Sequence, residues 1–396
     1  MIKKYPGFVY LFFILLIYSL SLSFRIKHIN QPLGRHHEWI TAHTLLTLKI
    51  WDQNSAASYY YSPVYSYNYP EDKKVGMLGG ISDADGNDYY VSYGPFAFIF
   101  PYAVFKLLQI PASAMALQIL NMILHFVSAF LILLSLHLIY GRKFKDGVFL
   151  PALIGYSVYL FLPATLWFQG NVYFSDTLVQ LFFISGIYFT LRLLYIDSIR
   201  MIDIVGIGAS VFLGIYTEWL GLFFAFTAFI VFFLKGIRNK NYFRPAIIVG
   251  VCSLFAFLLI VYQYAQISGM DNFINYWIEK YTLRSGAYGI DKSQYGYSIG
   301  NFESYKYLED HYNTNYLNLF NLFAFILPAF LVLVIFKRKY FFSYRDGMVL
   351  LLSALPVLMH HLILFNFTAV HDFSTLKSAV FFSFIVALIS FQIICF

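Results

Sequence analysis

Residues 114–140 read AMALQILNMILHFVSAFLILLSLHLIY and contain no aspartate, glutamate, lysine or arginine. A helix needs roughly 20 such residues to cross the hydrocarbon core of a bilayer. The same character holds along the whole chain, because 60% of its 396 residues are apolar and only 12% are charged. A water-soluble core of this size does not have that composition. The sequence therefore predicts an all-α, polytopic integral membrane protein that forms a single transmembrane domain over residues 1–396.

Ten stretches are apolar and long enough to be predicted as transmembrane helices. The first follows Lys3 and Lys4 as a signal peptide would, but no small-residue cleavage site precedes Arg25, so we expect an uncleaved signal anchor. The predicted spans are residues 8–24, 114–140, 148–166, 174–195, 202–217, 219–235, 245–265, 316–336, 347–366 and 376–396.

The loops between these spans differ in charge. Short loops carry about 15 of the 27 basic residues, which the positive-inside rule assigns to the cytoplasm. The long segments 25–113 and 266–315, with a few short turns, carry about 16 of the 20 acidic residues and are predicted to face outward. Both ends of the chain are then cytoplasmic. Since orientation explains the basic excess, nothing in the composition supports nucleic-acid binding.

The first outer loop contains two segments that we expect to be juxtamembrane helices, residues 36–51 and 94–110. The second is short, is broken by Pro101 and contains Lys106, so we predict an interfacial helix on the outer leaflet and not a crossing. Between the two helices, residues 81–93 place aromatic alternation after Asp85–Gly86, which predicts a β-hairpin.

Four short motifs occur in a particular order along the chain. They are Arg35–His36–His37–Glu38–Trp39, the run Tyr-Tyr-Val-Ser-Tyr-Gly-Pro at 89–95, NVYFSDTL at 171–178, and VHDFS at 370–374. In this order they resemble the GT-C superfamily, and most closely its protein O-mannosyltransferase and aminoarabinose-transferase-like branch, glycosyltransferase family 39 in the broad sense. The sequence departs from that branch at His37–Glu38, where an Asp-Glu pair is frequent, and at Gly94–Pro95, where Pro-Pro is usual.

The resemblance implies an enzyme of the bacterial cytoplasmic membrane with its active site on the outer face. Such an enzyme moves a sugar from a polyprenyl phosphate to a glycan, lipid or protein acceptor, usually with inversion at the anomeric carbon. A carboxylate takes the proton of the acceptor, and cationic groups stabilise the departing phosphate. The lipid-linked sugar is the donor, membrane lipids are partners, and a divalent metal is not expected. The implied catalytic residues are Glu38 and Asp176, and the implied substrate-binding residues are Arg35, His37, Tyr93, Arg284, His371 and Lys377.

Each of these residues also has a structural interpretation. Glu38 suits the solvated face of an amphipathic helix, Asp176 suits the positive end of a helix dipole, and Lys377 suits a snorkelling position at the head of the last span. The histidines at 36, 37 and 43 lack His-Glu-x-x-His spacing, which disfavours a zinc site. Histidines inside spans, at 125, 360 and 361, are predicted to make helix-packing hydrogen bonds.

A transporter or flippase of polar or lipid-linked substrates is the alternative function, and a membrane scaffold is a third. A transporter is expected to show repeated halves, broken helices and charges at mid-membrane depth. The sequence shows no internal repeat, and its acidic residues gather in the outer loops. These features favour the enzyme.

The predicted orientation can be tested by cysteine labelling. Ser82→Cys, made after Cys252 and Cys395 are replaced by serine, should react with a membrane-impermeant maleimide added outside intact cells. Labelling of Ser82→Cys only after the cytoplasmic side is opened would contradict both the orientation and the family resemblance.

Overall fold

The computed structural model describes residues 6–67, 69–73, 80–140, 150–196, 199–287, 296–318 and 343–395. Most helices in this part of the chain are α-helices. The others are 3-10 helices of three or four residues and one 3-10 helix of seven residues. The α-helices are α1 (Pro6–Ser23), α2 (Glu38–Asn54), α3 (Phe96–Leu108), α4 (Ala114–Tyr140), α5 (Leu150–Phe161), α6 (Pro163–Asn171), α7 (Ser175–Tyr195), α8 (Met201–Thr217), α9 (Trp219–Arg238), α10 (Phe243–Ser268), α11 (Met270–Ser285), α12 (Phe302–Asn315), α14 (Tyr344–Ile363), α15 (Phe365–Val370) and α16 (Ala379–Cys395). The 3-10 helices are η2 (Ile26–His28), η3 (Ala56–Tyr59), η4 (Pro70–Asp72), η6 (Lys240–Tyr242) and η7 (Asp372–Ser378).

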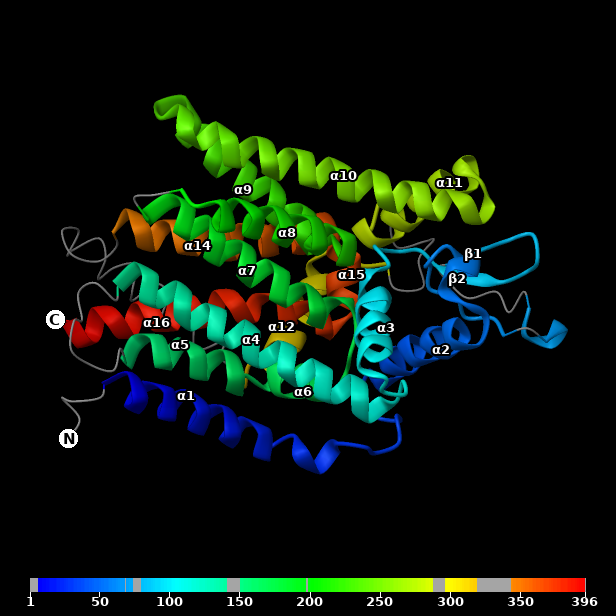
Figure 1. Ribbon diagram of the computed structural model, residues 1–396, viewed down its shortest axis with the longest axis horizontal. Helices are drawn as coiled ribbons and strands as arrows, with labels where there is room; N and C mark the ends of the chain where they lie inside the picture. Colours follow the sequence, from blue (N-terminus) through cyan, green and yellow to red (C-terminus); the bar gives the residue numbers. More distant parts are fainter. Residues whose placement is uncertain are drawn as a thin grey trace.

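The long helices run side by side in one bundle (Figure 1). Helix α1 begins and α16 ends at one end of this bundle, whereas α2, α3 and a small hairpin lie at the other end. Within the described ranges, seven helices are long and apolar enough to cross a membrane, and α3 and α8 are shorter apolar helices. The chain is therefore an integral, multi-pass membrane protein, as the sequence predicted.

The number of crossings differs from the predicted ten. The described part of the chain contains seven candidate spans, or eight if a bent helix pair is one span. That pair is α5 and α6, which meet at an angle of 59° in place of the straight helix predicted over 148–166. The bend follows from Pro163, which has no backbone N–H and begins a new helix. The predicted span 316–336 lies almost entirely outside the described residues, so the count of ten is not confirmed.

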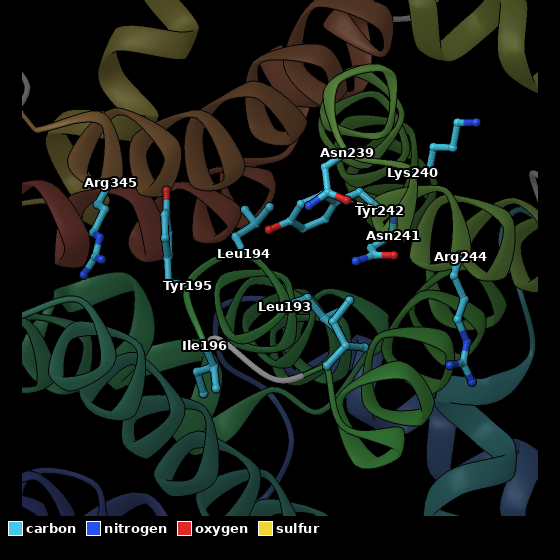
Figure 2. A pocket seen from close by; sticks show the side chains of 11 residues that line it. Leu193, Leu194, Tyr195, Ile196, Asn239, Lys240, Asn241, Tyr242, Arg244 and Arg345 are labelled. Atoms are coloured by element: carbon cyan, nitrogen blue, oxygen red, sulfur yellow. Dashed lines mark hydrogen bonds between the residues drawn. The ribbon is translucent and has the colours of Figure 1, made fainter.

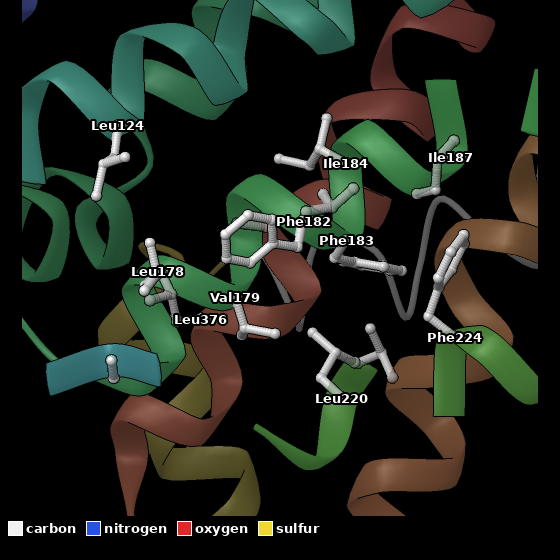
Figure 3. Packing of buried hydrophobic residues seen from close by; sticks show 14 of the residues in the cluster. Leu124, Leu178, Val179, Phe182, Phe183, Ile184, Ile187, Leu220, Phe224 and Leu376 are labelled. Atoms are coloured by element: carbon white, nitrogen blue, oxygen red, sulfur yellow. The ribbon is translucent and has the colours of Figure 1, made fainter. Parts of the chain in front are cut away.

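The centre of the bundle is formed by α7 and α16. In the 18-residue apolar windows of the spans Ser175–Tyr195 and Asp372–Gln392, which correspond to these helices, 72% and 78% of the residues are buried. The corresponding values are 11% in the span with α1 and 28% in the span with α10, which lie at the periphery. Figure 3 shows the Phe183 side chain of α7 directed toward Phe224 of α9, and the centres of these two rings lie 5.6 Å apart. Because lipid tails are as apolar as these side chains, the hydrophobic effect does not drive the helices together. Van der Waals packing between the helices stabilises such an interior instead.

Helices α8 and α9 form a hairpin with a single-residue break at Glu218. Their backbones approach closely beside the break, since a Cβ on Gly221 would lie 2.1 Å from the carbonyl carbon of Gly214. Small residues permit this approach. Glu218 has extended backbone, and its Oε2 accepts a hydrogen bond of 2.7 Å from the Leu220 N–H at the start of α9. The side chain thereby caps α9 inside the bundle.

The first outer loop contains the elements that the sequence predicted. Helices α2 and α3 cover the predicted segments 36–51 and 94–110, and α3 runs across the direction of the long helices (Figure 1). Strands β1 (Gly80–Ser82) and β2 (Asp88–Tyr90) pair antiparallel, with Ile81 opposite Tyr89, which confirms the hairpin. The location of α2 and α3 at the membrane surface stays a prediction.

Candidate active site

A cavity of about 410 Å³ lies at the end of the bundle that carries α2, α3 and the hairpin. It is bounded by α2, by the start of α7, by the end of α11, by α15 and by the residues that follow α15. Its lining residues are Trp39, Ile40, His43, Tyr65, Tyr90, Tyr93, Phe98, Phe174, Asp176, Lys280, Leu283, Arg284, Asn366, Phe367, Val370, His371 and Phe373. Among these described residues Asp176 is the one carboxylate.

Asp176 belongs to a buried group of ionisable side chains. Its Oδ1 binds the Nζ of Lys377 in η7, and that Nζ lies 3.8 Å from Oε1 of Glu218. The same Glu218 oxygen lies 3.2 Å from Nε2 of His360 in α14. All four side chains are almost completely buried. A single ammonium therefore bridges two carboxylates at a place where neither carboxylate could remain charged alone.

The position of Asp176 is set locally by the start of α7. The Thr177 hydroxyl accepts a hydrogen bond of 3.2 Å from the Phe174 N–H and donates one of 2.9 Å to the Phe174 carbonyl. These bonds close the first turn. The Asp176 side chain projects from this turn and lies between the cavity and the interior of the helix bundle. One of its carboxylate oxygens binds Lys377, and the other lies 3.3 Å from the Ser175 hydroxyl.

Arg284 and Lys280 supply positive charge to the cavity. The Arg284 guanidinium donates hydrogen bonds to the Ser92 carbonyl at 3.3 Å and the Tyr90 hydroxyl at 3.2 Å, and lies 4.8 Å from the centre of the Phe367 ring. No carboxylate of the described residues forms an ion pair with either cation. Burial, with repulsion from Arg284, lowers the pKa of Lys280 to about 8. Lys280 is therefore protonated at neutral pH.

Arg284 is held in place by the end of α11. The helix ends at Gly286, whose φ of +79° is left-handed and whose N–H donates to the Leu283 carbonyl at 3.3 Å. A Cβ at this glycine would meet the Tyr297 carbonyl oxygen at 2.2 Å, so a side chain is not accommodated. Asn366 binds the Leu283 carbonyl at 2.8 Å and ties the end of α11 to α15.

Aromatic side chains form a continuous wall. Trp39 contacts His43 with ring centres 5.0 Å apart, His43 contacts Tyr65 at 4.8 Å, Tyr65 contacts Tyr90 at 6.1 Å, and Tyr90 contacts Tyr93 at 5.2 Å. Burial raises the pKa of Tyr65 and Tyr93 well above the usual value, so their hydroxyl groups stay protonated. The wall therefore offers flat apolar faces and neutral hydrogen-bonding groups.

The structure separates the predicted site residues into two sets. Asp176, Tyr93, Arg284 and His371 line the cavity, and Lys377 touches it through Asp176. His371 is neutral, because burial and the nearby charges of Arg284 and His37 lower its pKa to about 3. It can offer a ring N–H but not positive charge.

The second set consists of Arg35, His37 and Glu38, which do not line the cavity. Glu38 is buried at the start of α2, and its Oε2 accepts hydrogen bonds from the backbone N–H groups of Gly34 at 3.0 Å and Arg35 at 2.8 Å. The Arg35 side chain is exposed and binds His28. In this arrangement Glu38 closes the turn that leads into α2, and its role as general base stays a prediction.

His36, His37 and Asp372 form a group whose ligand atoms lie within 4.8 Å of one another, as metal ligands do. The Nε2 atoms of His36 and His37 lie 2.8 and 2.7 Å from the two carboxylate oxygens of Asp372. Two imidazoles and a carboxylate are a ligand set that suits zinc. Here each Nε2 shares a hydrogen bond with Asp372, and this contact fastens the first outer loop to the start of η7. The prediction that no divalent metal takes part is not tested by this arrangement.

Sequence reasoning missed three members of the site, namely Glu218, His360 and Lys280. The predicted spans 202–217 and 219–235 leave Glu218 as the single residue between them, and His360 is predicted to be a helix-packing residue. The available signal was Glu218 itself, the one charged residue in the apolar stretch 204–234, since an ionisable residue at such a position is by default a functional candidate. Its partner Lys377 lies 159 positions further along, and no sequence pattern links the two.

Comparison with known proteins identifies the fold. The crystal structure of ArnT from Cupriavidus metallidurans bound to undecaprenyl phosphate superimposes with a TM-score of 0.57 at 12% identity, covering 96% of this chain and 59% of that chain. The archaeal oligosaccharyltransferase AglB from Archaeoglobus fulgidus, in complex with an inhibitory peptide and a dolichol-phosphate, gives a TM-score of 0.48 at 13% identity, with 98% and 50% covered. No protein-family model and no curated protein sequence matches.

The chain thus spans about three-fifths of the length of the ArnT chain. The fold of this chain is therefore similar to that of ArnT, which agrees with the fold that the sequence resemblance predicted. At 12% identity this likeness concerns the course of the backbone and not the identity of the substrates.

The buried charge group yields a prediction about stability. Lys377→Met should lower the free energy of unfolding by about 3–5 kcal/mol, because it leaves two buried carboxylates without their shared cation. Lys306→Met is the control, since its ammonium makes a surface pair with Glu303 at 2.9 Å and such pairs contribute about 1 kcal/mol or less. Thermal unfolding in detergent would measure both. If Lys377→Met unfolds at the same temperature as the control variant, the ammonium does not hold the group together; the double variant Lys377→Met/Asp176→Asn should recover part of the loss.

Proposed function

We propose that this protein is a glycosyltransferase that moves a sugar from a polyprenyl-phosphate-linked donor to an acceptor at the outer face of the membrane. The observation that carries the proposal is the content of one cavity, which combines the carboxylate of Asp176 with the cations Arg284 and Lys280. The similar fold of ArnT, solved with undecaprenyl phosphate bound, supports a polyprenyl phosphate as the lipid.

The proposed reaction is a direct displacement. An acceptor hydroxyl or amine attacks the anomeric carbon, the bond from that carbon to the phosphate oxygen breaks, and the lipid phosphate leaves with the bonding electrons. The acceptor loses a proton to a carboxylate. Inversion follows because the nucleophile and leaving group lie on opposite sides of the same carbon.

Arg284 and Lys280 are suited to the departing phosphate. Both side chains line the cavity, both are cationic at neutral pH, and the Arg284 guanidinium already has its orientation set by Ser92 and Tyr90. Cations arranged before the reaction stabilise the charge that develops on the leaving oxygen more effectively than mobile water does. His371 adds a neutral donor beside them.

Asp176 is the carboxylate in contact with the cavity and is our candidate for the group that receives the proton of the acceptor. Lys377 holds one of its oxygens, and the charge group below it fixes its direction. Glu38 remains the second candidate, on the strength of the family resemblance. The aromatic wall from Trp39 to Tyr93 supports binding of a sugar ring by stacking. We expect the acceptor to be a glycan, lipid or protein on the outer side.

Two conservative substitutions distinguish the candidate bases. Asp176→Asn and Glu38→Gln keep the shape of each side chain but cannot accept a proton. Loss of general-base assistance should reduce turnover about 10²–10⁴-fold with little change in KM. Turnover is measured as polyprenyl phosphate released from lipid-linked sugars of the host membrane, detected by mass spectrometry. We expect Asp176→Asn to show the loss. A loss confined to Glu38→Gln assigns the base to the first loop, and near-normal turnover in both variants rules out this mechanism.

A further prediction concerns the pH dependence of lipid-phosphate binding. Lys280 loses its proton as the pH rises through about 8, so the cavity loses positive charge above that pH. The Kd for undecaprenyl phosphate should be about tenfold higher at pH 9 than at pH 7, the change expected when one proton is linked to binding. The fluorescence of Trp39, which lines the cavity, provides the signal.

Lys280→Arg is the matched control for that titration, because arginine stays charged throughout this range. Its affinity for undecaprenyl phosphate should not change between pH 7 and 9. Equal pH dependence in the variant and the natural protein would show that Lys280 does not contact the phosphate.

A further inference from the structure

We propose that the opposite end of the bundle contains a second, separate site, which binds the headgroup of an anionic phospholipid. The site is a recess of about 710 Å³ between the ends of α7, α9, α10 and α14 (Figure 2). It lies at the end that the positive-inside rule assigns to the cytoplasm. It shares no residue with the candidate active site and does not depend on the proposed function.

The recess is lined by three cations from three different segments. Lys240 belongs to η6, Arg244 to the start of α10 and Arg345 to the start of α14; in Figure 2 Arg345 lies on one side of the recess and Lys240 and Arg244 on the other, with the Lys240 side chain directed outward. A second recess of about 580 Å³ adjoins the first, shares Tyr195 and Arg345 with it, and adds Lys235. Four cationic side chains therefore line these two recesses, which have lining residues in common.

No carboxylate of the described residues forms an ion pair with any of these four cations. The two nearest described acids along the chain are already engaged. Asp203 pairs with Arg192 at 2.5 Å, and Asp346 accepts a hydrogen bond of 2.8 Å from the Ser343 N–H and another from the Tyr140 hydroxyl. The described walls of the recess thus carry positive charge that a bound anion would neutralise.

Aromatic rings hold two of the cations in fixed positions. The Lys235 ammonium lies 5.1 Å from the centre of the Tyr344 ring, 5.6 Å from Tyr242 and 6.0 Å from Tyr195, and the Arg345 guanidinium lies 4.9 Å from Tyr195. These cation–π contacts orient the cations without neutralising their charge. The Tyr195 hydroxyl is buried and has no hydrogen-bond partner among the described residues, so a donor is available at the same place.

The remaining walls favour a lipid over a soluble phosphate. Leu193, Leu194, Ile196 and Ile199 line the recess beside the cations. The neighbouring start of α8 is apolar and exposed, with Met201 64% and Ile202 63% accessible, which is expected of a surface that faces acyl chains. In a phospholipid, the phosphodiester would bind the cations and the two acyl chains would contact the apolar residues. Basic recesses between membrane helices on the cytoplasmic side are suited to such headgroups.

The test uses the full-length protein in a neutral detergent, titrated with dioleoylphosphatidylglycerol or dioleoylphosphatidylcholine and observed by native mass spectrometry. We expect the anionic lipid to bind more tightly. Arg244→Gln should weaken its binding about fivefold and Arg244→Gln/Arg345→Gln about 25-fold, on the basis of roughly fivefold for each cation near an anionic headgroup. Tyr195→Phe, which removes only the hydroxyl, should weaken binding about tenfold.

Arg238→Gln is the matched control, because Arg238 is an exposed arginine at the same end of α9 that does not line either recess. It should leave lipid binding unchanged. Equal affinity for the two lipids, or equal weakening by Arg238→Gln and Arg244→Gln, would overturn the proposal. Competition by sn-glycerol 3-phosphate at concentrations comparable with the lipid would assign the site to a soluble phosphate and likewise overturn it.

Discussion

Inside the bundle one ammonium group, that of Lys377, lies between two buried carboxylates that come from different helices. Asp176 begins α7, Glu218 separates α8 from α9, and His360 reaches the same point from α14. Breaking a buried ion pair on one side leaves a charge that protein and lipid cannot solvate, so the positions of these helices are linked to one another. The most buried spans, α7 and α16, are also those that meet at this group or lead away from it.

This constraint places the candidate active site. Asp176 turns one oxygen to Lys377 and lines the cavity, so the charge group inside the bundle determines where the candidate base lies. The opposite walls come from outside the bundle, namely α2, the hairpin region and α11. The contact of His36 and His37 with Asp372 brings the first outer loop against η7, five residues before Lys377. The loop that contains His36 and His37 therefore contacts η7, the short segment to which Lys377 also belongs.

The two ends of the bundle carry different chemistry. One end combines a carboxylate, a wall of aromatic rings and two cations that form no ion pair with any described carboxylate, all around a cavity. The other combines four cations and a buried tyrosine hydroxyl around a recess that borders the apolar surface. Both arrangements suit phosphate-bearing lipids, but among the described lining residues only the first contains a carboxylate. This difference separates proposed catalysis at one membrane face from proposed lipid binding at the other.

The sequence by itself determined that this is a multi-pass membrane protein, where most of its long apolar helices lie, where the hairpin turns and which fold it resembles. These properties depend on residues close together in the chain: long apolar runs, clustered loop charges and the Asp85–Gly86 turn. It also named Asp176, Tyr93, Arg284 and His371, which line one cavity. Only the tertiary structure decided that Lys377 binds Asp176, that Glu218 and His360 join them, and that Glu38 lies outside the cavity lining. Those relations depend on contacts between residues more than a hundred positions apart, which hydrophobic periodicity and short motifs do not encode. The bend between α5 and α6 depends on both sources of information. Pro163 is visible in the sequence, but whether it bends the span or ends it depends on packing.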